Sequence, residues 1–261
     1  MRDVEKLFRL DGRVALVTGG SGRIGTSLCH GLAGMGATVV CASRKIEACR
    51  EVAEAITAAG GKAMALPLDL ADPQSVAALH EAAEAETGGV DILINNAVSQ
   101  FPGPLEDYPL EDWEASMAID ATGYFRITQL FLNDMVARGR GNIISVASVL
   151  GMVGPDERLY PATGAAGYRP NYFFVKAGVV GFTRYLAVTY ADRGIRANCI
   201  SPGGVRREPP PPGAKGFIDQ VPMKRIAHPD EMIGAAVYLA SDASAYVTGH
   251  NLVVDGGYTA W

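Results

Sequence analysis

The sequence predicts an α/β fold in which one parallel β-sheet is covered by helices on both faces. Short apolar runs rich in β-branched residues alternate along the chain with longer helical patterns, which is typical of parallel sheets buried on both sides. The composition, 48% hydrophobic and 20% charged, excludes a disordered chain. Glycine occupies 31 of 261 positions, against a usual share of about 7%. It shows no repeat period, so we expect it to serve turns and close backbone contacts.

Seven strands are expected in chain order, each a short apolar run bounded by turn or helix signals: Val14–Thr18, Thr38–Ala42, Ala63–Pro67, Asp91–Asn95, Asn142–Val146, Arg196–Ile200 and Asn251–Val254. Helical patterns between them predict helices near Ile24–Gly34, Ile46–Ala59, Pro73–Thr87, Leu110–Ala137, Asn171–Asp192 and Pro229–Ala240. No linker interrupts this alternation, so we expect a single doubly wound domain over residues 1–261.

Two of these helices have well-marked starts. Asp72 precedes Pro73, which predicts an N-cap followed by proline at the first helical position. Pro229 is followed by Asp230 and Glu231, two acidic residues that favour the positive end of a helix.

Basic and acidic residues are interspersed, 23 against 28, giving a net charge of −5. No basic cluster is available to a phosphate backbone, so we expect no nucleic-acid partner. The segment from Met1 to Asp11 is charged, which argues against a signal peptide, and no apolar run approaches the ~20 residues of a membrane span. Four cysteines without a C-x-x-C pair are typical of a reducing compartment. We therefore expect a cytoplasmic protein without a membrane partner.

The four histidines give no metal-ligand spacing, so we expect no metal site. His30 and His80 fall in helices that we expect at the surface, His228 precedes a helix, and His250 adjoins the last strand.

A glycine-rich turn joins the first expected strand to a helix and reads Thr18-Gly19-Gly20-Ser21-Gly22-Arg23-Ile24-Gly25. Glycines at such a turn let the chain reverse tightly and let its backbone approach a pyrophosphate. The N-terminus of the helix also offers free N–H groups to the anion. A plain turn is the alternative, but the position in the first strand–helix unit favours dinucleotide binding.

This turn resembles the first motif of the short-chain dehydrogenase/reductase (SDR) family, T-G-x-x-x-G-x-G. Thr18, Gly19 and Gly25 match it, whereas Arg23 takes the place of the middle glycine. The resemblance continues over nearly the whole chain and implies a Rossmann fold. Matching segments after later strands are Asp69-Leu70, Asn95-Asn96-Ala97 with Val98 replacing a glycine, and Pro202-Gly203.

The resemblance implies a nicotinamide cofactor held by residues at the strand ends. These are Gly19, Ser21, Arg23, Ile24, Gly25, Ser43, Arg44, Asp69, Leu70, Asn95, Asn96, Ala97, Tyr172, Lys176, Pro202, Gly203 and Val205. The family's threonine shortly after the proline–glycine pair is missing, and Arg206 and Arg207 lie in that region.

The residues after the second strand favour NADP over NAD. An acidic side chain there would accept from the ribose 2′-OH and repel a 2′-phosphate, but the chain has Ser43 followed by Arg44. Arg44 could pair with the phosphate, and Arg23 adds positive charge nearby. The alternative is that Arg44 only begins a solvated helix, which keeps NAD possible.

Tyr172 and Lys176 are spaced i, i+4 on an expected helix, so they share one face. A tyrosine acts as an acid–base near pH 7 only where a neighbouring cation favours its phenolate. Ser148 follows the fifth strand, at the edge of the sheet where such folds bind ligands. The three residues match the family's catalytic serine, tyrosine and lysine. The match implies an NAD(P)-dependent enzyme that interconverts a secondary alcohol and a ketone.

Other tyrosines fit this role less well. Tyr168 has Tyr172 rather than a lysine four residues on, Tyr160 lies in an expected loop, and Tyr185 and Tyr190 fall deeper in the helix. The enoyl-reductase variant of the family needs six residues between tyrosine and lysine. The residue that far before Lys176 is Arg169, so the spacing excludes that variant.

Asp120 occupies the family's fourth catalytic position, where an asparagine is usual. The resemblance assigns the role largely to the main-chain carbonyl, which Asp120 retains and which holds a water in a proton relay. We also consider that its carboxylate could tune Lys176, if the two lie close together.

Two segments are expected beside the substrate. Residues 149–170 form an inserted loop whose ends are both catalytic, and residues 203–222, with the proline run Pro209–Pro212, form a lid. Arg158, Arg169, Arg206 and Arg207 could bind an acidic or hydroxyl-rich substrate; packing on a neighbouring subunit is the alternative for the inserted loop. Such an insertion resembles those of a bacterial subgroup of the family, and this resemblance implies a sugar or sugar-acid substrate. The closing segment Val253-Val254-Asp255-Gly256-Gly257 resembles the family's last strand and turn, which with the long helices implies a homotetramer. Trp261 would be an exposed apolar side chain in a monomer, which agrees with an interface.

Two other functions stay open. The same scaffold could serve a non-redox enzyme, such as an epimerase or dehydratase. The departures at Arg23, Val98 and Asp120 could instead mark an inactive nucleotide sensor.

Overall fold

All seven strands join one parallel sheet in a computed structural model that describes residues 3–156, 169–206 and 214–261. The strands are β1 (Val14–Thr18), β2 (Thr38–Ser43), β3 (Lys62–Pro67), β4 (Ile92–Asn95), β5 (Gly141–Val146), β6 (Ile195–Pro202) and β7 (Asn251–Val254). Their order in the sheet is β3-β2-β1-β4-β5-β6-β7. The order reverses between β1 and β4, and ligands bind doubly wound sheets at such a reversal. The predicted fold class is confirmed.

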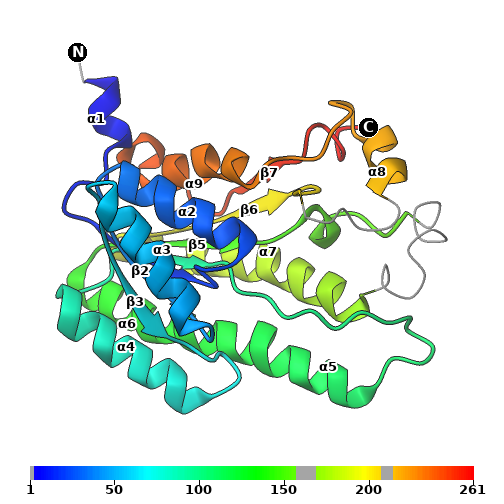
Figure 1. Ribbon diagram of the computed structural model, residues 1–261, viewed down its shortest axis with the longest axis horizontal. Coiled ribbons are helices and arrows are strands. Elements are labelled where there is room, and N and C mark those ends of the chain that lie inside the picture. The colour runs from blue at the N-terminus through cyan, green and yellow to red at the C-terminus, as the bar shows by residue number, and fades with distance from the viewer. Residues whose placement is uncertain (1–2, 157–168, 207–213) are drawn as a thin grey trace.

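The helices α2 (Arg23–Gly34), α3 (Ile46–Ala58) and α9 (Ile233–Ala240) cover one face, where Leu28, Ile56 and Leu239 are buried against the sheet. The other face carries α4 (Pro73–Thr87), α6 (Tyr124–Arg138) and α7 (Pro170–Tyr190), and Figure 1 shows these two groups on opposite sides. Leu79, Phe131 and Leu186 lie in this second core.

The predicted starts of two helices are confirmed. The Asp72 side chain accepts from Gln74 N at 2.9 Å, so it caps α4. Pro229 begins a 3₁₀ turn, Pro229–Met232, that leads into α9, and His228 and Glu231 form a capping box before it.

The helix predicted over Leu110–Ala137 is present as a continuous helical segment, but its middle is not α-helical. The structure has α5 (Leu110–Met117), a π-helical turn over Ala118–Gly123, and then α6. Here Gly123 passes so close to the loop after β3 that a Cβ would lie 2.2 Å from Leu70 O. This contact comes from a distant segment, and the local helical pattern does not reveal the π-helical turn.

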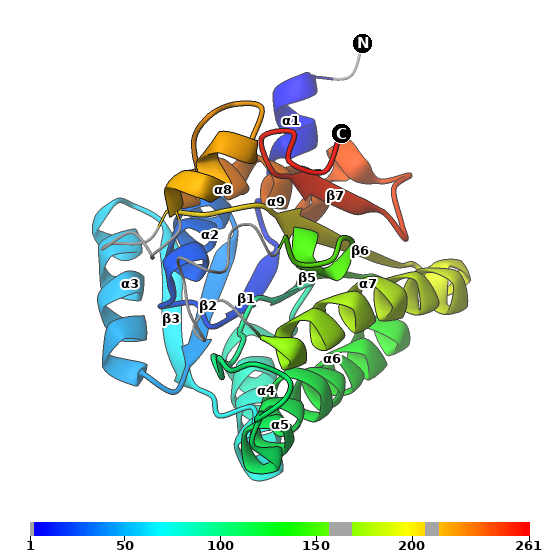
Figure 2. The same cartoon turned by 90° about the vertical axis from the view of Figure 1, so that its right-hand side faces the viewer.

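Short elements without a strong pattern were also not predicted. They are α1 (Val4–Phe8), α8 (Ala214–Gln220) and the 3₁₀ turns Val149–Gly151, Ala191–Arg193 and Asp242–Ser244. The helix α8 lies beside the C-terminal segment in Figure 2, and the Phe217 and Tyr258 rings are 4.9 Å apart.

Candidate active site

A cleft of about 540 Å³ opens at the carboxyl edge of the sheet. It is lined by segments that follow β1 to β6. Its predicted members are Gly19, Ser21, Arg23, Ile24, Ser43, Arg44, Asp69, Leu70, Asn96, Ala97, Ser148, Tyr172, Lys176, Pro202, Gly203 and Val205. The structure therefore brings most of the predicted residues into one place.

The glycine turn after β1 has the shape of a cradle for an elongated anion. Gly19 has a φ of +62°, and a Cβ on it would lie 3.0 Å from Ala97 Cα. A Cβ on Gly25 would lie 2.1 Å from Gly19 O, so a side chain there would push α2 off the turn. Gly22 is the N-cap of α2 and has no side chain to occupy the helix N–H groups. The turn thus fits a pyrophosphate at a helix N-terminus.

Thr18 and Asn96 fix this turn to the loop after β4. The Thr18 hydroxyl accepts from Asn96 N at 3.0 Å and Ala97 N at 3.1 Å. Asn96 Nδ2 in turn donates to Thr18 O at 2.9 Å and Gly19 O at 3.1 Å. The two segments that would hold a dinucleotide on either side are therefore one hydrogen-bonded unit.

Arg23 begins α2 in the place of the family's middle glycine. Its Nη1 donates to Val205 O at 3.4 Å and Arg206 O at 3.3 Å. The exposed guanidinium therefore links the phosphate turn to the segment after β6.

The far end of the cleft combines small hydroxyls with cations. Ser43 Oγ lies 2.9 Å from Ser21 Oγ and accepts from Lys45 N at 3.1 Å. Arg44 and Lys45 are exposed, line the cleft and stand just before α3. Among the described residues at the end of β2, none of those that line the cleft is acidic.

Three thiols lie buried beneath this end. Hydrogen bonding to Cys29 and burial raise the pKa of Cys41, and hydrogen bonding to Cys41 and burial raise the pKa of Cys49. A Cβ on Gly20 would lie 2.6 Å from Cys41 Sγ, so the turn needs glycine at this contact too. The four cysteines are free and buried.

Ser148 reaches the cleft from a 3₁₀ turn packed on α7. Its Oγ accepts from Leu150 N at 3.1 Å, so its own hydrogen remains available to a ligand. A Cβ on Gly151 would lie 2.5 Å from Lys176 O. Glycine therefore allows the turn that carries Ser148 to approach the helix that carries Lys176.

Tyr172 and Lys176 lie on the face of α7 toward the cleft. Lys176 is only 4% exposed, and its Nζ donates to Val146 O at 2.5 Å. The same Nζ is 5.5 Å from the Tyr172 ring centroid. A buried ammonium is thus held between the end of β5 and the tyrosine.

The hydrogen bonds of the Asp120 carboxylate go to two serines rather than to Lys176. The carboxylate accepts from Ser99 N at 2.8 Å, from Ser116 Oγ at 3.2 Å and from Ser99 Oγ. No ion pair joins it to Lys176 in the described part of the chain. Asp120 does lie in the π-helical turn, a feature that often occurs at functional sites.

Sequence comparison finds a family model and curated relatives that match nearly the whole chain. Residues 20–259 match a family model described as enoyl-(acyl carrier protein) reductase. D-threitol dehydrogenase of Mycolicibacterium smegmatis is 36% identical over 257 residues, which cover 97% of this chain and 95% of that protein. Cis-4-hydroxycyclohexanecarboxylate dehydrogenase of Sinomonas cyclohexanicum is 38% identical over 257 residues, or 95% and 97% of the two chains.

Solved structures with a similar fold are also those of dehydrogenases. A short-chain type dehydrogenase/reductase from Mycobacterium marinum has a TM-score of 0.89 at 34% identity and covers 99% of both chains. A gluconate 5-dehydrogenase from Burkholderia cenocepacia, in complex with NADP and tartrate, has a TM-score of 0.89 at 33% identity over 99% of this chain and 100% of that one.

The chain belongs to the SDR family. It is an NAD(P)-dependent oxidoreductase that interconverts CH–OH and C=O groups. The alternatives of a non-redox enzyme and an inactive sensor gain no support, because these curated relatives are named as dehydrogenases. No helix in the described ranges is long and apolar enough to cross a membrane.

Three predicted site residues do not line the cleft of this SDR enzyme. Gly25 lets α2 pack closely on Gly19, and Asp120 accepts hydrogen bonds from Ser99 and Ser116. Asn95 is buried and donates from Nδ2 to Thr128 Oγ1 at 3.0 Å, so it supports the loop from beneath.

The sequence analysis missed other lining residues: Lys45, Leu68, Ser99, Gln100, Ile119, Val146 and Ala147. Each lies within three positions of a predicted residue, so the extension of each motif by a few positions would have found most of them. Arg169 lines the cleft, as its place in the inserted loop suggested, and its Nη1 donates to Gln100 Oε1 at 2.8 Å.

Several predictions fall outside the described residues. They concern Arg158, Tyr160, Tyr168, Arg207, the proline run Pro209–Pro212, and the parts of the inserted loop and lid within 157–168 and 207–213.

Tyr185, one of the tyrosines set aside as a catalytic candidate, is 55% exposed, and its ring stacks on the Phe182 ring with the two centroids 5.8 Å apart.

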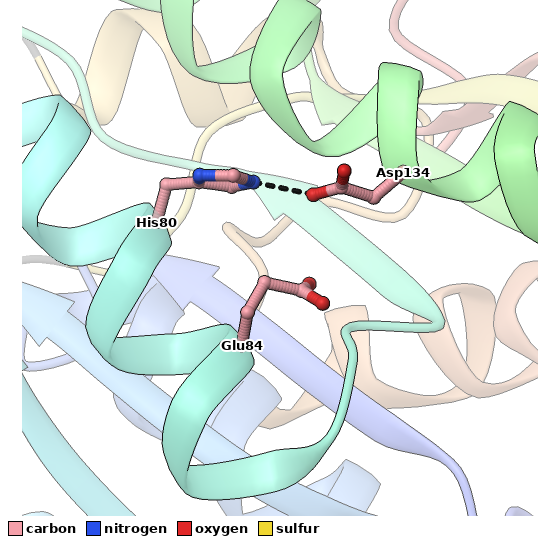
Figure 3. Close-up of side chains that lie close together, drawn as sticks. All are labelled: His80, Glu84 and Asp134. Atoms are coloured by element: carbon pink, nitrogen blue, oxygen red, sulfur yellow. Dashed lines mark hydrogen bonds and ion pairs between the residues drawn. The ribbon is translucent and has the colours of Figure 1, made fainter.

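One cluster outside the cleft has the composition of a metal site. The ligand atoms of His80, Glu84 and Asp134 lie within 4.8 Å of one another, and Figure 3 shows His80 hydrogen-bonded to Asp134 across α4 and α6. His80 is thus half-buried, and its contact with Asp134 is a structural one between α4 and α6. Glu84 already accepts from Val90 N at 3.2 Å and pairs with Arg138 at 3.3 Å. The Arg138 guanidinium therefore offsets negative charge in this cluster, and the contacts of the cluster join α4 to α6.

Proposed function

We propose that this enzyme is an NADP-preferring dehydrogenase of small polyols or sugar acids. The observation that carries the proposal is one cleft with Ser148, Tyr172 and Lys176 at one end and Ser43, Arg44 and Lys45 at the other. The first set suits proton transfer at an alcohol oxygen, and the second suits a 2′-phosphate.

The proton chemistry follows from the partners of each side chain. The nicotinamide cofactor, when bound, supplies or accepts the hydride. Ser148 donates its free hydrogen to the substrate oxygen, and Tyr172 gives that oxygen a proton in reduction or removes one in oxidation. Lys176, held by Val146 O, favours the phenolate by its charge. The main-chain carbonyl of Asp120 would hold a water in the proton relay.

Cofactor preference rests on charge. Arg44 is exposed at the cleft and has no ion-pair partner in the described ranges, and a serine stands where an acidic residue would repel a 2′-phosphate. Fluorescence titration with NADPH and NADH tests this choice, and we expect tighter binding of NADPH. Equal or tighter binding of NADH would overturn it.

The substrate class rests on the polar groups at the mouth. Ser99, Gln100 and Arg169 line the same cleft as Tyr172 and would hydrogen-bond to hydroxyl or carboxylate groups of a substrate. Relatives named for D-threitol and galactitol, and a gluconate 5-dehydrogenase crystallised with tartrate, support this class. A panel of polyols, sugar acids and plain ketones, followed at the nicotinamide absorbance, tests it. Turnover of plain ketones alone would overturn it.

We further propose a cytoplasmic homotetramer of one-domain chains, with residues 149–170 and 203–222 as substrate-covering segments. Four free thiols suit a reducing compartment. Exposed apolar side chains on α6 and α7, and Trp261 at 80% exposure, suit subunit contacts.

A further inference from the structure

The catalytic helix begins without a local cap. Tyr172 lies in the first turn of α7, whose N-cap residue Arg169 makes no side-chain hydrogen bond to the helix and whose first turn has no acidic residue. Helix ends open more easily than helix centres unless outside partners hold them. The position of Tyr172 therefore depends on contacts made by its neighbours.

A buried chain of hydrogen bonds starts at Asn171, the residue before Tyr172. Asn171 is 1% exposed and donates from Nδ2 to Ser116 Oγ at 2.8 Å. Ser116, fully buried in α5, donates to Asp120 at 3.2 Å, and Asp120 accepts from Ser99 N at 2.8 Å. The chain thus connects the first turn of α7 to the loop after β4 that lines the cleft.

The negative charge of Asp120 sets the direction of these bonds. A carboxylate only accepts, so Ser116 spends its single hydrogen on Asp120 and can only accept from Asn171. The Asn171 amide must then turn its NH₂ toward Ser116. Its Oδ1 is buried without a hydrogen-bond partner in the part of the chain described. An asparagine with an unpaired oxygen is costly, which points to a gain elsewhere.

We propose that Asn171 and Ser116 are positioning residues that hold Tyr172 in its catalytic place, with Asp120 as the terminal acceptor that orients them. This proposal rests on the proposed role of Tyr172. It gives the unusual aspartate a function through Ser116 and Asn171, and not through Lys176.

The direction of the bonds can be tested with variants of nearly unchanged size. Asn171→Asp replaces the donor by a second acceptor, so Ser116 has one hydrogen for two carboxylates. We expect kcat to fall about 10- to 100-fold, because small displacements of catalytic groups cost that much. The dissociation constant of NADPH should stay within about twofold, because Asn171 does not line the cleft.

The double variant Asn171→Asp/Asp120→Asn moves the charge to the other end of the chain. Ser116 then donates to residue 171 and accepts from residue 120, so every bond is possible again. We expect kcat to recover at least tenfold relative to Asn171→Asp. If the double variant is no better than Asn171→Asp, or if Asn171→Asp is as active as the wild type, the proposal is wrong.

Amide hydrogen exchange over residues 170–175 separates positioning from catalysis. Asn171→Asp and Ser116→Ala should both speed exchange there and should move the pH–rate profile of alcohol oxidation upward, because a displaced phenolate is farther from Lys176. Ser116→Ala tests the same bond if Asn171→Asp does not fold. Thr183→Val is the control, since its hydroxyl donates within α7, to Val179 O at 2.8 Å, far along the helix from Asn171, and we expect neither readout to change.

The outcomes distinguish this inference from the proposed function. Faster exchange with normal kcat and an unchanged pH profile would overturn positioning, even if Tyr172 is essential. Full activity of Tyr172→Phe would overturn the proposed function, whatever the exchange data give.

Discussion

Tyr172 is the residue on which the proposed proton transfer depends, because Lys176 is the cation held beside its ring. The lysine is buried and tied to Val146 O, so its charge is fixed near the tyrosine. Replacement of Tyr172 should therefore abolish the proton transfer and leave the rest of the cleft in place.

Tyr172→Phe should lower kcat at least 10²-fold, the usual contribution of general acid–base catalysis. NADPH binding, measured by fluorescence titration, should persist because the phosphate turn is untouched. Tyr185→Phe is the matched control on the same helix, where the ring stacks on Phe182, and we expect it to keep full activity. Residual activity of Tyr172→Phe near the wild-type level would show that another group moves the proton.

Arg44 carries the second prediction at this scale. A charge-assisted hydrogen bond contributes about 1.5–3 kcal/mol, so Arg44→Ala should raise the KM for NADPH about 10- to 100-fold and leave the KM for NADH nearly unchanged. Arg50→Ala, in the helix that follows Arg44 but paired with Glu47, is the control and should change neither value. A parallel rise for both cofactors with Arg44→Ala would show that the side chain does not recognise the 2′-phosphate.

At the scale of elements, the sequence predicts what is periodic or bounded by local signals. β1 and β7 have the predicted bounds, and α4 begins at its capped proline. The π-helical turn before α6 includes Gly123, which packs against Leu70 of a distant segment, and Ser99 and Gln100 lie in a loop without periodicity. Such features depend on the tertiary structure, so the motifs located the cleft but not its whole lining.

Gly151 decides how closely the Ser148 turn packs on α7. Gly151→Ala puts a methyl group 2.5 Å from Lys176 O, so the turn must move. We expect kcat to fall at least tenfold, because displaced catalytic groups lose rate steeply, with a lower Tm in thermal melting. Gly154→Ala has open space around its Cβ and serves as the control. Equal behaviour of the two variants would remove this role for Gly151.

The charge of Glu231 should make the stability of the segment before α9 depend on pH. Hydrogen bonds from Arg225 and from His228 N lower the pKa of Glu231 from 4.5 to about 2. A carboxyl group with a lowered folded-state pKa stabilises the protein above its unfolded pKa and loses that effect as pH falls through the folded value. Glu231→Gln should therefore lower Tm at pH 7, and the difference should shrink between about pH 4.5 and pH 2. A Tm difference that is constant over this range would rule out the charge as its cause.

At the scale of the whole molecule, one apolar surface spans two helices. Phe125 on α6 lies 6.3 Å from Phe182 on α7, and Tyr185 stacks on the same ring. Val188, one turn further along α7, is 85% exposed. Apolar groups gathered in this way are typical of an interface, and α7 also carries Tyr172 and Lys176. Assembly through this surface would stiffen the catalytic helix from behind.

Val188→Glu therefore should break the proposed assembly, because a charge buried in an apolar interface lacks a partner. Light scattering during gel filtration should give a tetramer for the wild type and a smaller species for the variant, with kcat reduced as α7 loses support. Val4→Glu is the control, since Val4 is 65% exposed in α1, a helix that Figure 1 shows away from α7. A wild-type monomer with full activity would contradict both the assembly and its supporting role, whereas a monomeric variant with full activity would leave assembly without a part in catalysis.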